Sequence, residues 1–559
     1  MEKRLIAAIV LSFLVLMGYQ LLFVKPKPLT EASQTATSPV PAAGTQALPT
    51  GQVPPSVTEA KPAAQTPPAP ELKETGAPAE AQLSVETSLY SAAWSNRGGV
   101  LKSWKLKRHL NDLKKKEPLD LVPAAARETG LFPFSLGGDD RALAGALNAA
   151  LFDAPTTGLS LRDGETGELR FAYSDGKTVR AEKVFRFTGG TYQVGIELHV
   201  WKGGQEIPPV LLWGPGIGNP TPDELKGKFT AVTGAAIYTG GKVNRMDVKK
   251  YKAETNAFNF VDWAAFEDSY FTALFVLPSQ KGQAVFLMEA PGQGKLPAYF
   301  LSVTQPQQAF IGPKESGALK DFGHDANKVI RFGSFLGLNL QPVAEVMLAG
   351  VKFFHRFVPN WGLAIILLTL VIKIIFFPLT YSSTKSMAKM ADLQPKVKAL
   401  RAKYKKAKTD IAQRRLMNEE MMKLYKENGV NPAGGCLPLL IQMPVFVGAY
   451  QMLTAAVEFR HAPFGLWLKD LSVADPIWVT PILMGITQFI SQKMTPTSAD
   501  PTQAKMMLIM PVMMTVFFIS FPSGLVLYWL TTNVLQIAQQ AIMNRMMARK
   551  KRESDGKRR

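Results

Sequence analysis

Long apolar segments lie at the start and in the last third of the chain, and a more polar stretch separates them. The first, residues 5–24, is long enough to cross a bilayer as a helix and longer than the apolar part of a cleaved signal peptide. Residues 1–24 are therefore expected to form an uncleaved transmembrane anchor. Five further segments are expected to span the membrane, which gives six transmembrane helices in all: residues 361–380, 434–457, 476–491, 504–521 and 523–543.

Residues 25–82 have the composition of a linker. They are rich in Pro, Ala, Thr and Gln, as in PVPAAGTQALPT, and contain too few large apolar residues to form a core. A segment of this kind is expected to be disordered and partly extended.

Residues 83–340 show short alternating segments that are typical of β-strands. ELRFAYSDGKTVRAEKVFRF has an Asp175-Gly176 turn between two segments with a period of two, and FRFTGGTYQVGIELHV repeats this design around Gly189-Gly190. YFTALFVLP and GQAVFLMEA add further strands. About 250 residues of this pattern predict one all-β domain, either a sandwich or a barrel.

Residues 341–360 predict an amphipathic helix that lies in the membrane interface. One face is charged and the opposite face is apolar. The charged face has Glu345, Lys352 and Arg356, and the apolar face has Val343, Val346, Met347, Gly350, Val351, Phe354, Phe357 and Val358.

Residues 361–543 form the expected helical core, which includes a helical hairpin over residues 381–433. Two apolar stripes at helical spacing predict the arms of this hairpin, and Thr409 and Asp410 offer an N-cap between them. The stripes are Leu393, Val397, Leu400 and Tyr404 in the first arm and Met417, Met421 and Leu424 in the second.

The formal net charge of +20 is concentrated beside the apolar segments. The hairpin and the tail, residues 544–559, hold far more basic than acidic residues, whereas EFRHAPFGLWLKDLSVAD is nearly balanced. Because basic loops stay in the cytoplasm, the hairpin and the tail are expected there. An even number of spans then places both termini in the cytoplasm and the β domain outside it. Membrane topology thus explains the charge before nucleic-acid binding does.

The sequence contains no recognisable catalytic or metal-binding motif. Cys436 is the only cysteine, which excludes an intrachain disulfide and a cysteine-based metal site, and the five histidines are scattered. No GxxxxGK[ST], HExxH or GxSxG motif occurs. The sequence therefore predicts neither an enzyme nor a cofactor.

Lys373 is a charged residue inside the apolar segment LVIKIIFFPLT. It lies about 18 Å along a helix from Trp361, on a face shared with Thr369 and Thr380. Either its stem carries the ammonium to the cytoplasmic headgroups, or the ammonium lines a hydrated cavity. The other expected spans offer polar but no acidic partners, which favours a hydrated groove. These polar residues are Gln442, Thr487, Gln488, Thr532, Asn533, Gln536, Gln539 and Gln540.

The hairpin also carries a basic cluster, Lys403, Lys405, Lys406 and Lys408. Such a cluster is either a solvated surface that sets the topology or a docking site for ribosomal RNA or anionic lipid. The sequence leaves both interpretations open.

Four segments of the core closely resemble the YidC/Oxa family of membrane protein insertases. They are FFPLTYSSTKSMAKMADLQPKVKAL, YKENGVNPAGGCLPLLIQMPVFVGAYQML, DPIWVTPILMGITQFISQKMTP and MPVMMTVFFISFPSGLVLYWLTTN. The anchor and the β domain, with WGPGIGNP and WAAFEDSYFTALFVLP, resemble the Gram-negative members, whose periplasmic domain is similar to the galactose mutarotase-like supersandwich. The resemblance implies a polytopic α-helical protein of the bacterial inner membrane with an all-β periplasmic supersandwich domain.

The resemblance also implies a function and a site. Members of the family insert and help fold inner-membrane proteins, alone or with the Sec translocon, through a groove open to cytoplasm and lipid. Lys373 matches the position of the usual groove arginine, Thr369, Gln442 and Tyr528 match other groove positions, and Trp529 stands where a second tyrosine is often found. The implied partners are nascent inner-membrane proteins, the Sec translocon, the ribosome and anionic membrane lipids.

Two other functions fit parts of the sequence. A transporter or channel with Lys373 as an anion site would need a path open alternately to both sides, and no inverted repeat is evident. A carbohydrate-active β domain would need a catalytic pair of residues, and none is recoverable from the sequence. The insertase is therefore the function that we expect.

Overall fold

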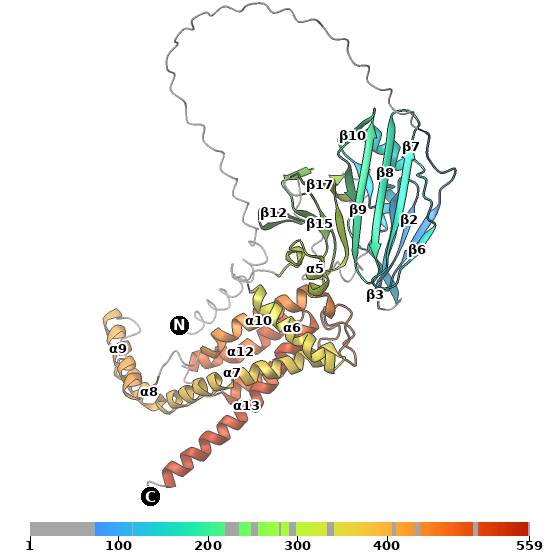
Figure 1. The fold of residues 1–559 in the computed structure, drawn as a ribbon. Helices are drawn as coiled ribbons and strands as arrows, with labels where there is room; N and C mark the ends of the chain where they lie inside the picture. The colour runs from blue at the N-terminus through green and yellow to red at the C-terminus, as the bar shows by residue number, and fades with distance from the viewer. Residues whose placement is uncertain are drawn as a thin grey trace, which may run out of the picture. The chain divides into compact units, whose positions relative to one another are not determined.

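The computed structural model describes residues 73–113, 116–218, 234–247, 255–278, 281–289, 298–332, 340–404, 410–430, 437–495 and 501–556. The expected anchor, residues 1–24, and the linker up to residue 72 lie outside these ranges. The described chain forms a domain of β-strands followed by a set of helices (Figure 1).

The β domain contains three sheets (Figure 1). The first has the order β4 (Glu117–Asp120), β3 (Val100–Asp112), β2 (Tyr90–Ser95), β1 (Gln82–Glu86) and β6 (Gly158–Ser160). The second has the order β13 (Lys242–Asp247), β12 (Gly234–Thr239), β15 (Trp263–Glu267), β16 (Phe271–Val276), β19 (Gln308–Pro313), β9 (Gln193–Lys202), β8 (Val179–Thr188) and β7 (Thr166–Ser174), and β10 (Gln205–Ile207) also pairs with β9. The third has the order β14 (Thr255–Asn259), β17 (Gln283–Glu289), β18 (Ala298–Thr304), β11 (Val210–Trp213) and β5 (Ser135–Gly137).

Both turns expected from the sequence join neighbouring strands of the second sheet. Between β7 and β8, Asp175 Oδ1 accepts hydrogen bonds of 2.8 to 2.9 Å from the backbone N–H groups of residues 177–179. Gly176 has φ = 70°, and Gly190, between β8 and β9, has φ = 78°, which is the left-handed region that glycine adopts without steric cost. YFTALFVLP and GQAVFLMEA contribute β16 and β17, as predicted.

An aromatic cluster joins the three sheets. The ring of Trp94 on β2 lies 4.5 Å from that of Phe185 on β8 and 5.1 Å from that of Phe134. Phe134 in turn meets Trp213 of β11 at 5.9 Å. Each ring of this size buries about 150 to 250 Å², so the cluster is a major source of the domain's stability. The domain is mostly β-sheet, and its short helices are α2 (Ala125–Thr129), α3 (Arg141–Ala149), α5 (Ser316–Phe322) and the 3-10 helix η1 (Ala326–Val329).

The last residues of the expected linker belong to the β domain. Thr75 and Ser174 exchange backbone hydrogen bonds of 3.0 and 2.8 Å, and the Ala77 N–H donates to Leu151 O at 3.0 Å. The expected disorder therefore does not extend over residues 73–81. The reason is that the edge of β7 supplies hydrogen-bond partners that the composition of the segment does not reveal.

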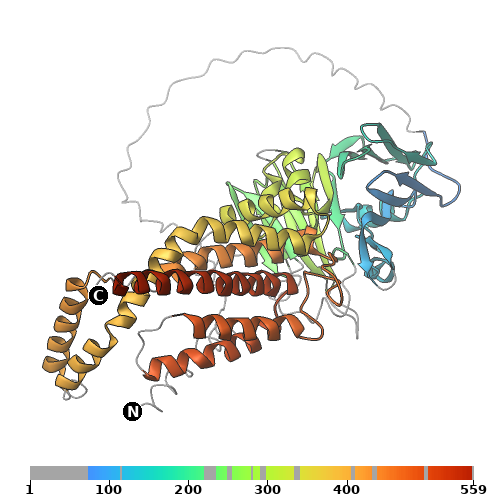
Figure 2. The same ribbon diagram turned by 90° about the horizontal axis from the view of Figure 1, so that it is seen from below.

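Most helices of the second part are packed against one another, whereas the two arms of the hairpin extend away from them (Figures 1 and 2). The expected hairpin is present, and Asp410 caps its second arm by accepting from the backbone N–H groups of Ala412, at 2.9 Å, and Gln413. The helices are α6 (Gln341–Phe357), α7 (Trp361–Asp392), α8 (Gln394–Lys403), α9 (Ile411–Glu427), α10 (Leu437–Ala455), α11 (Val479–Met494), α12 (Pro501–Phe518) and α13 (Ser523–Gly556), with the 3-10 helix η4 (Val457–Phe459).

The apolar face that the sequence predicts for α6 is partly buried against other helices and partly exposed. Ala344, Met347, Leu348 and Val351 are buried in the same apolar cluster as residues of α7 and α10. Val346, Phe353 and Phe357 are exposed. The face toward the other helices is therefore centred on Met347 and Val351, and the rest of the apolar surface remains free to meet lipid.

α7 and α13 are longer than the expected spans. α7 continues past residue 380 to Asp392 although Pro378 removes one N–H from its ladder, and α13 continues through the expected tail to Gly556. Among the described residues, α7 is the helix that is long and apolar enough to cross a membrane, and Leu508–Phe518 is a shorter apolar segment. The count of six spans therefore stays a prediction.

Lys183 is a buried charge in the core of the β domain. Its Nζ donates hydrogen bonds to Gly98 O at 2.6 Å and to Phe134 O at 2.8 Å. Carbonyl oxygens satisfy its donors but carry no full negative charge to compensate for lost hydration. Desolvation therefore lowers the pKa of Lys183 from its ordinary value to about 7.

This burial predicts a pH-dependent stability. Between about pH 7 and pH 10 the unfolded chain binds a proton at Lys183 that the folded chain has lost, so the free energy of unfolding rises with pH by about 1 kcal/mol per unit. Thermal unfolding of the detergent-solubilised chain at several pH values measures this rise. Lys183→Met should flatten it, and Lys177→Met, at an exposed position, should not. The same slope in all three proteins would contradict the assignment.

Candidate functional site

Lys373 lies among exposed apolar residues of α7 but is itself half-buried. Its Nζ donates a hydrogen bond of 3.0 Å to Gln536 Oε1 on α13. Figure 2 shows the two helices side by side. Within the described part of the chain, no carboxylate forms an ion pair with this ammonium, and a neutral amide leaves its charge uncompensated. The structure thus places a cation between α7 and α13.

Thr369 lies one helical turn before Lys373 and is buried. Its Oγ1 donates to the backbone oxygen of Ile365 at 2.7 Å, within its own helix. The hydroxyl donor is therefore already used. Thr369 shares the helix face of Lys373, as the sequence indicates, but serves the packing of α7.

Gln442 and Tyr528 are in direct contact. The Nε2 of Gln442, on α10, donates to the hydroxyl oxygen of Tyr528, on α13, at 2.9 Å. Tyr528 is buried, whereas Gln442 is half-buried. This bond ties α10 to α13 and leaves the Gln442 carbonyl oxygen available as an acceptor.

Trp529 faces α11, away from the Gln442–Tyr528 pair. Its Nε1 donates to Gln488 Oε1 at 3.3 Å. Its ring packs edge-on against Phe446 of α10, with centroids 4.7 Å apart, and lies 5.5 Å from that of Phe518 of α12. Trp529 therefore joins three helices through one polar and two aromatic contacts.

α13 is the element that brings these residues together. One of its rows meets α10 and α7 through Tyr528 and Gln536. A second row meets α11, where Asn533 Nδ2 donates to Met484 O at 3.2 Å and Asn544 Nδ2 donates to Met494 O at 3.3 Å. Tyr528, Gln536, Asn533 and Asn544 each bond with a polar group on another helix, which is how polar side chains stabilise a bundle in lipid.

Sequence reasoning did not identify Gln536 as the partner of Lys373. The available signal is the spacing of Tyr528, Thr532 and Gln536, which are four residues apart and therefore follow one side of a helix. That spacing indicates a polar row on α13. It does not say which helix faces the row.

The outward surfaces of the core are apolar. The exposed residues of α7, α11 and α12 include Leu370, Ile374, Ile375, Ile482, Ile486, Ile490, Leu508, Val512 and Val516. Large exposed apolar surfaces of this extent are typical of contact with lipid or with another apolar partner. The polar rows of α13 therefore lie within a set of helices whose exterior suits a membrane.

The four lysines that the sequence suggests as a cytoplasmic docking site are only partly described. Lys403 Nζ pairs with Glu420 at 2.8 Å across the hairpin, and the Tyr404 hydroxyl donates to the same carboxylate at 2.7 Å. The bond with Glu420 raises the pKa of Lys403. Lys405, Lys406 and Lys408 lie outside the described residues.

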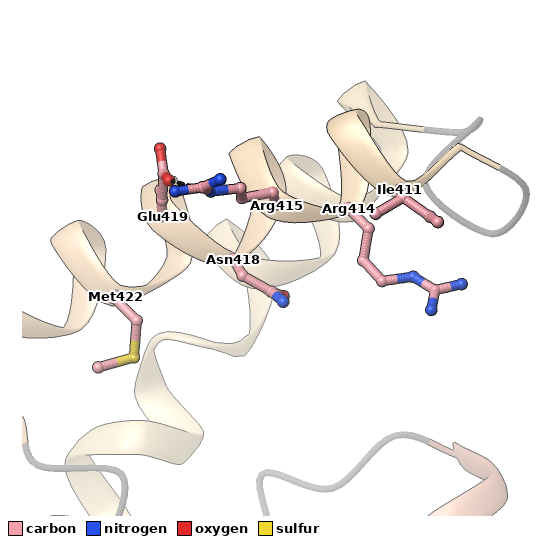
Figure 3. Close-up of a pocket in the computed structure, with 6 residues that line it drawn as sticks. All are labelled: Ile411, Arg414, Arg415, Asn418, Glu419 and Met422. Carbon is pink, nitrogen blue, oxygen red and sulfur yellow. Dashed lines mark hydrogen bonds and ion pairs between the residues drawn. The ribbon is translucent and has the colours of Figure 1, made fainter.

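A shallow pocket lies on α9 (Figure 3). It is lined by residues of one helical face, among which Arg415 pairs with Glu419 at 3.3 Å. The lining residues are Ile411, Arg414, Arg415, Asn418, Glu419 and Met422. None of them belongs to the polar set around α13. In the described ranges, no group of His, Cys, Asp or Glu side chains is arranged to hold a metal ion.

The Gln442–Tyr528 bond predicts a measurable coupling between α10 and α13. Tyr528→Phe and Gln442→Leu should each lower the free energy of unfolding, and the double variant should cost less than the sum, with a coupling of about 0.5 to 1.5 kcal/mol. Unfolding of the purified protein in mixed micelles measures the four members of the cycle. Additive effects would show that the two side chains do not interact.

The comparisons with known proteins cover both parts of the chain. The family model of the YidC periplasmic domain matches residues 82–343, and the model described as 60Kd inner membrane protein matches residues 353–551. A membrane protein insertase YidC of Citrifermentans bemidjiense is 38% identical, over 98% of this chain and 100% of the relative. That of Syntrophus aciditrophicus is 36% identical over the same shares.

A solved structure of an active YidC insertase with its first transmembrane domain resolved is also similar. It is 21% identical, covers 83% of this chain and 93% of its own, and has a TM-score of 0.35. The sequence relatives and the two family models, rather than this structural likeness, decide the membership. The chain belongs to the YidC family of membrane protein insertases.

Proposed function

We propose that this chain inserts and helps fold inner-membrane proteins through a hydrophilic groove formed beside α13. The proposed groove residues are Lys373, Thr369, Gln442, Tyr528 and Trp529. The observation that carries the proposal is the ammonium of Lys373, which lies between two helices with a neutral amide as its partner. An ammonium in this position is suited to attract acidic residues of a segment that is crossing the membrane.

The physical role of the groove is to shorten the apolar path. A charged residue at the centre of a bilayer costs about 2.5 to 3.5 kcal/mol on insertion scales, and polar side chains that keep water nearby reduce this cost. The polar rows of α13 supply such side chains. The apolar surfaces of α11 and α12 offer the adjacent lipid boundary into which the apolar part of a client can move.

Thr369, Tyr528 and Trp529 then have different roles from Lys373. The Thr369 hydroxyl bonds within α7, whereas Tyr528 and Trp529 bond with α10 and α11 and hold these two helices against α13. Among the described residues Lys373 has one partner, the neutral amide of Gln536, and it can exchange this partner for a carboxylate. Gln442 can serve both roles, because its amide nitrogen bonds with Tyr528 and its carbonyl oxygen is available to a client.

The topology is part of the same proposal. Six spans in the bacterial inner membrane would place both termini and the α8–α9 hairpin in the cytoplasm and the β domain in the periplasm. The basic hairpin and the basic end of α13 support this orientation. The Sec translocon, the ribosome and anionic lipids are the partners that we propose beyond the client proteins themselves.

Substitutions of Lys373 test the groove. Lys373→Arg should retain insertion, and Lys373→Glu should damage it most. Lys373→Ala should slow clients with acidic translocated tails about fivefold or more, because a charge attraction of about 1 kcal/mol or more is lost. The measurement is insertion of one client into proteoliposomes, with either acidic or neutralised tail residues.

Lys493→Ala and Lys493→Glu, at an exposed lysine near the end of α11, are matched controls and should change insertion little. Protein amounts and protease resistance are compared for every variant. Equal insertion of both clients by wild type, Lys373→Ala and Lys373→Glu would show that Lys373 only reaches the headgroups.

Substitutions in the hairpin test its role as a docking site. Replacing Lys403, Lys405, Lys406 and Lys408 with serine should weaken ribosome association and lower the slope of log affinity against log salt by about one for each lysine that contacts phosphate. Co-sedimentation with ribosomes over a salt series measures this. The matched control replaces four lysines of the β domain, Lys116, Lys177, Lys242 and Lys320. Unchanged co-sedimentation of the hairpin variant would leave only the topological role.

A further inference from the structure

The loop between α10 and α11, residues 456–478, has an inverted distribution of polar and apolar side chains. Asp475 is 1% exposed, and its carboxylate accepts four hydrogen bonds of 2.8 to 3.1 Å. Leu466, Ile477 and Trp478 are 88%, 54% and 54% exposed. Loops in water show the opposite arrangement, because carboxylates are rarely buried and large apolar side chains rarely point outward together.

Asp475 organises the loop from within. Its donors are the Trp467 indole N–H, the Ile477 backbone N–H and the backbone N–H and hydroxyl of Thr480. Burial disfavours its charged form, but these hydrogen bonds outweigh burial and hold the pKa of Asp475 below its ordinary value. Asp470 is also turned inward, where it accepts from the backbone N–H and the hydroxyl of Ser472. The loop is therefore rigid, and the outward position of its apolar residues is fixed.

Two of the exposed residues also have unfavourable backbone conformations. Leu466 has φ = 53° and Trp478 has φ = 59°. Bulky side chains rarely occupy the left-handed region, where glycine or asparagine would cost less. The side chains of these two residues are more than half exposed and so gain little from packing within the loop, and an environment outside the chain accounts for them better.

The helices next to the loop show what that environment is. Asn360 caps α7 by accepting from the Leu363 N–H at 3.0 Å, and its Nδ2 donates to Phe464 O at 2.9 Å, which fixes the turn carrying Leu466 beside the first turn of α7. Trp478 directly precedes α11, and its backbone oxygen accepts from the Ile482 N–H at 3.1 Å. Leu466 and Trp478 therefore lie at the ends of two helices whose exposed sides are apolar.

We propose that Leu466, Ile477 and Trp478 insert into the headgroup boundary of the lipid bilayer and anchor the α10–α11 loop there. Tryptophan favours this boundary, and the exposed Lys469 can reach lipid phosphates from the same loop. α7 and α11, which begin beside these residues, also expose apolar side chains such as Leu363 and Ile482, so lipid is the occupant that the surface fits. On the topology proposed above, the leaflet is the periplasmic one. The anchoring goes beyond the insertase function and does not depend on it.

Site-specific labels test this contact. In full-length protein with Cys436→Ser, a single Leu466→Cys, Ile477→Cys or Lys177→Cys is labelled with an environment-sensitive fluorophore, and the protein is placed in lipid nanodiscs without client or translocon. Nitroxide lipids should quench the labels at 466 and 477 at least about threefold more than the label at 177, an exposed turn of the β domain. Aqueous iodide should show the reverse order.

A second variant separates lipid contact from general shielding. Leu466→Asp in the Ile477→Cys protein should reduce lipid quenching at 477, whereas Leu466→Met should preserve it. Labels at 466 and 477 that iodide reaches as readily as the label at 177 would overturn the proposal and leave a protein partner or water as the occupant. Insertion is assayed separately, because its failure with quenching intact would concern the proposed groove rather than the anchor.

Discussion

An ammonium that has no carboxylate partner among the described residues is the constraint around which the helical core is arranged. Lys373 can remain between α7 and α13 because Gln536 accepts one of its hydrogen bonds. A carboxylate in the place of Gln536 would neutralise the charge, and an apolar residue there would leave the amine without a partner. The amide of Gln536 accepts a hydrogen bond from the Lys373 ammonium and brings no negative charge of its own.

Other polar residues of α13 also have specific hydrogen-bond partners on neighbouring helices. Tyr528, Trp529 and Asn533 each meet a different neighbouring group, and together they hold α10 and α11 against one helix. In lipid, polar contacts of this kind stabilise a bundle where no hydrophobic driving force acts between helices. The residues that fix the helices and the residue that remains free to exchange its partner are thus different ones. On the proposed function, this division would let the core stay folded while a client passes.

The sequence was sufficient for local features and insufficient for those that depend on distant partners. Asp175-Gly176 and Gly189-Gly190 are turns because their chemistry is local, and Asp410 caps α9 for the same reason. The polarity of Lys373 and Gln442 within apolar segments also identified them as candidates. The partner of Lys373 is 163 residues away, so no spacing rule could name it. Residues 73–81 show the same limit, since their order comes from the edge of β7 and not from their own composition.

The length of α13 has a mechanical consequence. Its 34 residues extend about 51 Å, whereas the hydrocarbon core of a bilayer is about 30 Å thick. On the proposed topology, roughly 20 Å of continuous helix stands in the cytoplasm and carries Arg545 and Arg549 with it. A large particle that touches this end meets a rigid spacer at a set height above the membrane surface. The length of the helix then sets the distance between the bilayer and such a particle. A polypeptide emerging from the particle has to cross that same distance to reach the membrane.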